Sequence, residues 1–507
     1  MTTPAKTPPS TRDKMTGALY WTFLPRVVQT VVTLGTSVVI FRTLGEFDAG
    51  RLKIVQAALT GIIIFFNLGL MQALNRFVPE IRVSAGVDQS RALLFRCLGL
   101  QSGLWFFSVL ALFLGRKFLY DFQPEYARIF LLGVLLSVVQ VSASTMNSYA
   151  IASYKAREVA VSLSLGTLVS AGMTVALFAV GLRIEGVLYA IAIGHLANFL
   201  IVVWMLRRFH GEKKSLRTTG SEFPWSRLLR YAVPWVPNNF LHFLVWGSSE
   251  TLLIGRFHSP EMAGFFDRAY TLPQQAMEFI PNAIYPLVLA SFSESSKVTK
   301  ERIPEIISYY YRLLFFAVVP IAYIGFVLGD LVVIALYGNE YAAAGPYCQV
   351  FFLIFMTTFF GTPLSMAIYV VEKVWVNLLL NVGYAAITIG LDLWLIPKYG
   401  LLGATIPTGF VTALTPFIRW HIAKRYVPGL TIPWAFILKI FTASSPIFLL
   451  FFLKPWADST LKLLPLTILA GLVAALCYRV FRVLGPEERA FISSSKLPAK
   501  ELILRIL

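Results

Sequence analysis

Charged residues are scarce in this chain: Asp, Glu, Lys and Arg make up 14% of its 507 residues, while 57% are hydrophobic. Soluble globular proteins carry about 25% charged residues, and the mean hydropathy here is +0.69. A deficit of this size excludes a protein whose whole surface faces water. It fits a chain whose solvent is mostly lipid.

Cysteines are also few, and Cys97, Cys348 and Cys477 lie in or beside apolar runs without a Cys-x-x-Cys pair. Neither a disulfide nor a zinc site is expected, and the three residues are predicted to pack as small hydrophobic side chains. The sequence shows no metal-binding motif, nucleophile–base constellation or glycine-rich phosphate loop. We therefore expect no resident metal or cofactor and no enzymatic activity.

The net charge of +18 does not indicate a nucleic-acid partner, because Lys and Arg sit in short clusters between long apolar runs. That distribution orients proteins in membranes. Roughly two thirds of the 44 Lys and Arg residues fall on the side that holds both tails and the stretch 207–227, which predicts that both termini are cytoplasmic. The tail after residue 485 is predicted to form a short amphipathic helix on the inner surface.

Long apolar runs dominate the rest of the sequence. A spanning helix needs about 20 mostly apolar residues, and the first run is too long for the core of a signal peptide. The predicted fold class is all-α, a polytopic membrane protein of about fourteen transmembrane helices. The predicted spans are 17–41, 52–75, 92–114, 127–150, 159–181, 184–206, 228–255, 263–291, 306–328, 347–371, 374–395, 400–422, 434–453 and 463–484.

An internal repeat is indicated when the two halves are aligned, since Pro25 falls on Pro234 and Gly50 on Gly264. An even number of helices per unit keeps both units in the same orientation, so the repeat is expected to be parallel, about an axis along the membrane normal. The predicted layout is an N-terminal six-helix lobe (1–206), a cytoplasmic linker (207–227), a second six-helix lobe (228–422), and two further helices with a cytoplasmic tail (423–507).

Polar side chains recur at helical spacing inside these apolar runs, which places each set on one helix face. A charge at the bilayer centre costs about 2.5–3.5 kcal/mol or more, so such faces are expected to meet one another or water. We predict a hydrophilic cavity between the two lobes; hydrogen bonding between packed helices is the alternative. The main stripes are Arg26, Thr30, Thr33 and Ser37; Lys53, Gln56, Thr60 and Asn67; Asn239, His242 and Glu250; Asp267, Thr271, Gln274, Glu278 and Asn282; and Asn377, Asn381, Tyr384, Thr388 and Asp392.

The stretch FRTLGEFDAGRLKIVQAALTGIIIFFNLGLMQALNRFVPEI resembles the opening of bacterial polysaccharide exporters. Members of that family begin with an apolar helix, an R-x-LG-x-x-x-x-G turn, and a second helix with an LGL element and a basic-aromatic end. The segment LIGRFHSPEMAGFFDRAYTLPQQAMEFIPNAIYPLVLASFSE resembles the family's seventh and eighth helices. In the first of these two stretches, the residues that match the turn are Arg42, Leu44, Gly45 and Gly50. Leu68-Gly69-Leu70 match the LGL element, and Arg76-Phe77 match the basic-aromatic end.

The family is the oligosaccharide flippases of the O-antigen (Wzx) type, within the multidrug/oligosaccharidyl-lipid/polysaccharide exporter superfamily. The resemblance implies movement of an undecaprenyl-pyrophosphate-linked oligosaccharide from the inner to the outer leaflet by alternating access, for O-antigen and lipopolysaccharide synthesis. It implies a place in the bacterial inner membrane beside glycosyltransferases and a polysaccharide polymerase. Some relatives couple transport to a proton or sodium gradient. The protein is expected to act as a monomer.

A pyrophosphate needs cationic partners, and the related lipid II flippases rely on arginines near the first, second and eighth helices. Arg26, Arg51 and Arg268 lie in comparable regions of this chain. A membrane carboxylate can in turn exchange a coupling ion. The residues predicted to bind substrate are Arg26, Lys53, Arg268, Asn239, His242 and Gln274, and those predicted to couple ions are Glu250, Glu278, Asp392 and Asp267.

Two other readings stay open. A multidrug or small-metabolite transporter of the same superfamily usually has twelve helices, so the extra pair at 434–453 and 463–484 argues against it. The sequence RFVPEIRVSAGVDQSR, predicted as the loop after the second helix, lacks the Gly-x-x-x-Asp-x-x-Gly-Arg pattern of the major facilitators. A membrane polysaccharide polymerase or ligase would usually display a large outer loop, and the connections here are short.

Overall fold

The computed structural model of the protein describes residues 11–117, 124–208, 224–246, 249–295, 303–370, 374–457, 460–483 and 485. These ranges are helical apart from short turns and contain no strand, which confirms the all-α prediction. The helices divide into two compact units, unit 1 (Met1–Gly247) and unit 2 (Ser248–Leu507). The predicted helix after residue 485 and most of the predicted linker 207–227 lie outside the described residues.

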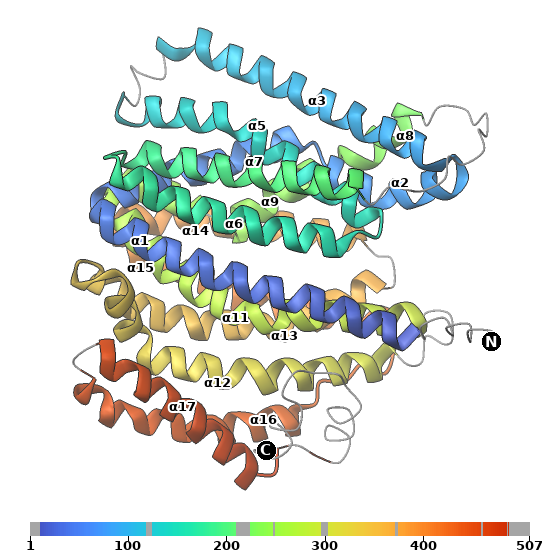
Figure 1. Ribbon diagram of the computed structural model, residues 1–507. Coiled ribbons are helices and arrows are strands. Elements are labelled where there is room, and N and C mark those ends of the chain that lie inside the picture. Colours follow the sequence, from blue (N-terminus) through green and yellow to red (C-terminus); the bar gives the residue numbers. More distant parts are fainter. Residues whose placement is uncertain are drawn as a thin grey trace, which may run out of the picture. The chain divides into compact units, whose positions relative to one another are not determined.

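Unit 1 is built from long helices, coloured blue to green in Figure 1. Helices α6 and α7 pack tightly because glycines remove side chains where they cross: a Cβ on Gly166 would lie 2.8 Å from the carbonyl oxygen of Gly194. Small residues at such crossings let helix backbones approach closely in membranes. The helices are α1 (Thr11–Asn67), α2 (Leu70–Ser84), α3 (Gly86–Leu114), α5 (Pro124–Ala152), α6 (Ala156–Ala179), α7 (Ile184–Arg208), α8 (Trp225–Ala232) and α9 (Trp235–Trp246).

Helix α1 covers the first predicted span, 17–41, and the second, 52–75, only as far as Asn67. It bends between them at Gly45, whose φ of 75° is open to glycine but strained for other residues. The bend is held from outside the helix by Arg183. Its guanidinium donates to the Leu44 carbonyl at 3.0 Å and pairs with Asp48 at 3.1 Å. One arginine therefore bridges the helical segments on either side of the bend.

The prediction of a loop at 76–91 is wrong, because most of this stretch is helical in α2 and the start of α3. Helix α2 is amphipathic: Leu70, Leu74, Phe77, Val78 and Ile81 are all buried. Its polar face is supported by an i,i+4 ion pair in which Arg76 lies 3.2 Å from Glu80. The charges of this stretch interrupt the apolar run, which favours a loop prediction, but their spacing suits a surface helix.

We expect Gly69→Ala to destabilise unit 1. Gly69 joins α1 to α2 with a φ of 67°, and an added Cβ would lie 2.1 Å from the carbonyl oxygen of Ala232. The left-handed conformation alone costs an L-residue about 1–2 kcal/mol, and the overlap with backbone adds to it. The melting temperature of the purified protein should fall clearly, whereas Gly99→Ala, with open space around it, should change it little. Equal melting temperatures for both variants would contradict this packing.

The predicted seventh span, 228–255, is broken into three short helices. Helices α8 and α9 belong to unit 1, and α10 (Ser249–Phe257) belongs to unit 2. Pro234 precedes α9 and Pro237 lies in its first turn. Because proline lacks the backbone donor and disfavours a helical residue before it, the break between α8 and α9 falls there.

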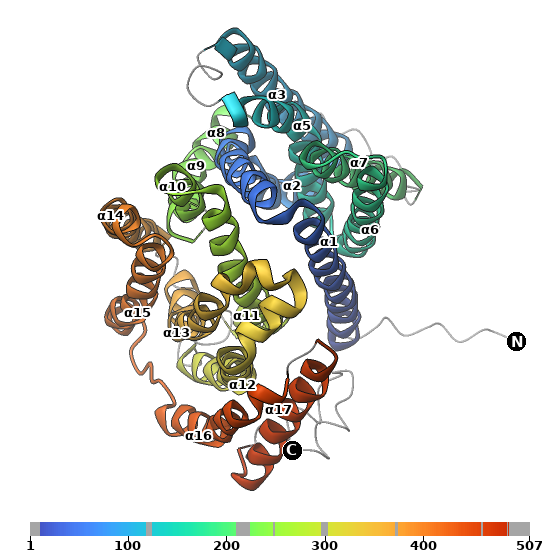
Figure 2. The same cartoon turned by 90° about the vertical axis from the view of Figure 1, so that its left-hand side faces the viewer.

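Unit 2 contains ten helical elements in its described part. Figure 2 views them nearly end on: α11, α12 and α13 lie together, with α14 and α15 on one side and α16 and α17 on the other. The elements are α10, α11 (Pro260–Ser295), α12 (Ile303–Tyr337), η2 (Asn339–Ala344), α13 (Gly345–Val370), α14 (Val374–Tyr399), α15 (Leu401–Tyr426), α16 (Trp434–Ser444) with its 3₁₀ continuation η3 (Ser445–Trp456), and α17 (Thr460–Val480).

The last two spanning segments contact α12 through one ion pair and one hydrogen bond. Lys454 of η3 pairs with Asp330 of α12 at 2.6 Å. The Tyr478 hydroxyl of α17 donates to the Phe316 carbonyl at 3.1 Å. The predicted thirteenth and fourteenth helices are thus part of unit 2.

Eleven helical segments of the described residues are long and apolar enough to cross a membrane. The first, Pro25–Arg82, includes the second predicted span, 52–75, and most of the first, 17–41, with the Gly45 bend between them. The predicted spans 228–255 and 263–291 are also helical, as α8–α10 and α11, but they are broken or polar. The multi-pass helical architecture expected from the sequence is confirmed.

Candidate functional site

A pair of buried carboxylates lies within unit 2, where α10, α14 and α15 pack together. Glu250 sits in the first turn of α10 and is 1% exposed. Asp392 lies in the C-terminal half of α14 and is fully buried. The two side chains interact electrostatically. Both were predicted as ion-coupling residues, and the fold brings them together from segments that are far apart in the sequence.

Glu250 is held by two hydroxyl groups. Thr408 of α15 donates to Oε1 at 3.4 Å, and the neighbouring Ser249 donates to Oε2 at 3.2 Å. The Thr408 hydroxyl also lies 3.0 Å from the carbonyl oxygen of Ala404, one turn earlier. A single hydroxyl hydrogen is thus shared between two acceptors, so the oxygen-rich site has few donors.

Asp392 lacks even these donors. Neither of its carboxylate oxygens has a hydrogen-bond partner within the described ranges. The hydroxyl of Thr388, one turn earlier on the same face of α14, is also buried without a partner. Burying an unpaired carboxylate is strongly unfavourable. These orphaned oxygens therefore suit a cation that the site takes up.

Oxygen donors favour hard cations or protons over zinc-like metals. No cluster of three or more His, Cys, Asp or Glu side chains able to hold a metal occurs in the described part of the chain. The donor set consists of the two carboxylates and the hydroxyls of Thr388 and Thr408. A monovalent cation or a proton bound to these oxygens would neutralise part of the buried negative charge.

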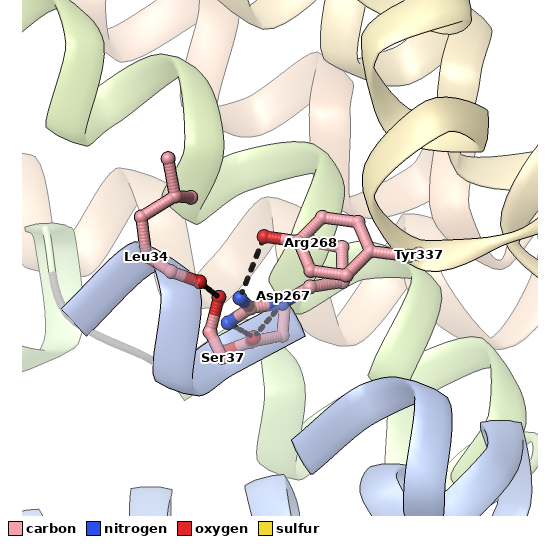
Figure 3. Close-up of polar contacts among 5 residues, drawn as sticks. All are labelled: Leu34, Ser37, Asp267, Arg268 and Tyr337. Carbon is pink, nitrogen blue, oxygen red and sulfur yellow. Dashed lines mark hydrogen bonds and ion pairs between the residues drawn. The ribbon is translucent and has the colours of Figure 1, made fainter. Parts of the chain in front are cut away.

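Asp267 and Arg268 form a second buried pair, on α11 (Figure 3). Arg268 is 3% exposed, its Nε donates to the Asp267 carboxylate at 2.9 Å, and its Nη1 donates to the Tyr337 hydroxyl at 3.2 Å. The guanidinium carbon also lies 5.4 Å from the centroid of the Tyr337 ring. In this structure the charge of Arg268 is balanced by its sequence neighbour, although the two were predicted to have separate roles.

We expect Asp267→Asn to destabilise the protein strongly, because removing one partner of a buried ion pair costs about 3–5 kcal/mol. Asp88→Asn is the matched control: its partner Arg91 is 3.8 Å away and the Asp88 side chain is 85% exposed. Exposed pairs contribute about 0–1 kcal/mol. Thermal unfolding should show a large loss for the first variant and almost none for the second. Similar melting temperatures would show that the α11 pair is not a stabilising contact.

Gln274 and Glu278 lie further along α11, where the Gln274 amide donates to Glu278 at 3.3 Å. Glu278 is exposed at the edge of a cavity of about 230 Å³ within unit 2. The cavity walls are mostly aromatic and hydroxyl-bearing. They comprise Met277, Pro281, Tyr310, Phe355, Thr358, Phe359 and Thr362. Glu278 is therefore not a member of the Glu250–Asp392 pair.

The predicted substrate residues of unit 1 are more accessible. Arg26 is half-buried and has no ion pair with any described residue. Lys53 lies 5.6 Å from the centroid of the Phe41 ring. Asn239 is half-buried and His242 is exposed on α9. Their predicted roles in binding stay predictions.

Several residues of these sites were missed from the sequence. Thr408 belongs to a row of buried threonines on α15 that could have been found from its helical spacing: Thr405, Thr408, Thr412 and Thr415. Tyr337 carried no such signal, because a tyrosine at the end of an apolar run is usually read as an interfacial residue.

Comparison with solved structures shows that the chain has the fold of membrane transporters of the MOP (multidrug/oligosaccharidyl-lipid/polysaccharide) superfamily. The lipid II flippase MurJ in an inward closed conformation aligns with a TM-score of 0.69 at 13% identity, covering 92% of this chain and 97% of that one. An inward-facing multidrug MATE transporter gives 0.64 at 12% identity over 82% and 98%. A MOP transporter from Pyrococcus furiosus gives 0.62 at 12% identity over 82% and 96%.

A comparison of the sequence with protein families adds to the comparison of structures. Residues 94–346 match the family described as polysaccharide biosynthesis protein. No curated protein sequence matches the chain significantly. The resemblance to the exporter superfamily that the sequence predicts is thus confirmed.

Proposed function

We propose that the protein is a flippase that moves a polyprenyl-pyrophosphate-linked oligosaccharide from the cytoplasmic to the outer leaflet for surface polysaccharide synthesis. The observation that carries this proposal is the match of residues 94–346 to the polysaccharide biosynthesis family, in a chain with a transporter fold. In this proposal the protein works in a bacterial inner membrane with both termini in the cytoplasm. O-antigen precursors are the substrates expected from the resemblance.

The extent of the structural similarity favours a lipid-linked substrate over a drug. The lipid II flippase covers 92% of this chain, whereas the multidrug transporter covers 82%. The difference is the size of two spanning helices of about 20 residues each. A lipid-linked substrate would need the apolar surface that extra helices offer, so the shared length supports a flippase.

The Glu250–Asp392 pair is proposed to couple transport to a cation gradient. An orphaned carboxylate in an apolar setting is expensive, so each conformation of a transport cycle that opens the site to solution would exchange a sodium ion or a proton there. No resident cofactor is proposed. The other predicted coupling residues are less suited to this role, because Asp267 is already paired and Glu278 is exposed.

Deletion of the gene tests the proposed function directly. We expect lipid-linked oligosaccharide to accumulate in the cytoplasmic leaflet and surface polysaccharide to disappear, and expression of the intact chain should restore it. Unchanged surface polysaccharide together with increased drug sensitivity would instead support the multidrug alternative. Accumulation of flipped but unpolymerised units in the outer leaflet would support a polymerase or ligase.

A further inference from the structure

Arg419 is a cation of unit 2 that the sites described above leave unused. It lies on α15, seven residues before the end of that helix at Tyr426, or about 10 Å along the axis. The side chain is only partly exposed, and its Nε atom is buried without a hydrogen-bond partner. A simple snorkelling arginine would instead extend its head into water.

Neighbouring helices hold the guanidinium inside the unit. Its carbon lies 6.0 Å from the centroid of the Tyr384 ring on α14. On α13, Gly361 lies beside the arginine: a Cβ there would be in ordinary van der Waals contact, 3.6 Å from Nη1 and 3.7 Å from Cδ of Arg419. The arginine thus lies beside the Tyr384 ring of α14 and beside Gly361 of α13.

No carboxylate among the described residues pairs with Arg419. Arg268 shows the contrast, because its buried charge is balanced by Asp267. The exposed Arg425, on the same helix, instead has a contact of 2.8 Å with His421. Arg419 therefore combines partial burial with an uncompensated positive charge, and such a charge in a membrane helix marks a functional site.

The missing partner is expected to be an anion that arrives from outside the chain. A guanidinium presents a rigid fork of donors that matches the oxygens of phosphate, and the buried Nε leaves one of these donors unused. The Tyr384 ring fixes the plane of the fork by a cation–π contact. An arginine prepared in this way would lose little conformational freedom on binding.

We infer that Arg419, oriented by Tyr384, binds the phosphate group of a lipid. The phosphate can come from two sources. One is the pyrophosphate of the lipid-linked substrate, and for this source the inference rests on the proposed function. The other source is the headgroup of an ordinary phospholipid. The predicted cytoplasmic end of α15 is where a substrate would enter from the inner leaflet.

Native mass spectrometry of the purified chain in maltoside micelles tests this inference with four probes. Undecaprenyl pyrophosphate and phosphatidylglycerol carry phosphate, whereas undecaprenol and diacylglycerol are their phosphate-free counterparts. Arg419→Gln should weaken binding of at least one phosphate lipid about tenfold or more and leave the phosphate-free lipids unchanged. Arg425→Gln is the matched control and should bind all four as the intact chain does.

Two outcomes of this experiment would overturn the inference. Equal binding of both phosphate lipids by the intact chain and Arg419→Gln would overturn the inference, as would a loss that includes the phosphate-free lipids. If Arg419→Gln cannot be purified, Arg419→Lys decides: it keeps the charge but not the fork, and should weaken only phosphate lipids. Unchanged binding by that variant would also overturn the inference.

Comparing undecaprenyl pyrophosphate with phosphatidylglycerol distinguishes a failure of this inference from a failure of the proposed function. Arg419-dependent binding of phosphatidylglycerol by a chain that does not bind undecaprenyl pyrophosphate would support the site and contradict the flippase proposal. If undecaprenyl pyrophosphate binds the intact chain and Arg419→Gln equally, and phosphatidylglycerol binding is also unchanged, the result would support the flippase and refute the site.

Discussion

Replacing Asp392 with Asn is expected to abolish cation-driven transport while leaving the protein folded. Asp392 is fully buried, and neither carboxylate oxygen has a hydrogen-bond partner in the described part of the chain. An amide is far less costly to bury than a charged carboxylate, so the variant should be at least as stable as the native chain without a coupling cation. What it should lose is the negative charge that attracts the cation.

Thermal unfolding of the purified protein at increasing sodium concentration measures this loss. A cation that binds only the folded state at 100 times its Kd stabilises by about 2.7 kcal/mol. The melting temperature of the native chain should rise with sodium, or with proton concentration if the proton is the coupling ion. Asp392→Asn and Glu250→Gln should not respond in this way.

Asp88→Asn is the control, because it removes an exposed carboxylate from unit 1. It should retain both the cation response and transport. Transport by the native chain that is indifferent to sodium and proton gradients would contradict the coupling role. So would an Asp392→Asn variant that still responds to the same cation as the native chain.

Arg26→Ala should reduce surface polysaccharide about tenfold or more while the protein still inserts into the membrane. Arg26 is half-buried and forms no ion pair with the described residues. The preceding Pro25 carbonyl accepts a hydrogen bond from Ser164 at 3.5 Å, which helps to fix this part of α1. A positioned arginine without an internal partner is suited to a pyrophosphate or an anionic sugar.

The assay compares polymer export with membrane abundance in a deletion strain that expresses each variant. Arg26→Lys should restore part of the export, because it retains the charge without the bidentate fork. Arg91→Ala removes an exposed arginine of α3 and should export normally. Normal export by Arg26→Ala would refute a role for this residue in substrate binding.

Much of the fold could be predicted because the hydrophobic runs report directly on helices that span a bilayer. The errors arose where that signal weakens. Helix α2 was assigned to a loop because its charges interrupt the apolar run, and the break between α8 and α9 was visible only as prolines at 234 and 237. The bend at Gly45 depends on Arg183, a contact between distant segments that no local pattern contains.

The candidate site was predictable residue by residue but not as an arrangement. Helical spacing identifies the polar face that carries Asp392, yet it does not say which other helix that face meets. Glu250 and Thr408 reach it through tertiary packing. For Asp267 and Arg268, helical spacing fails to predict a contact that the structure contains. Adjacent residues on a helix usually point apart, but the long arginine side chain returns to its neighbour.

Reconstitution of the purified chain into lipid vesicles tests the central claim most directly. A fluorescent polyprenyl-pyrophosphate-linked oligosaccharide is placed in one leaflet, and a membrane-impermeant quencher reports its arrival in the other. The account predicts translocation that needs the protein, is accelerated by a sodium or proton gradient, and is lost in Asp392→Asn. Translocation at the rate of protein-free vesicles, with or without either gradient, would contradict it.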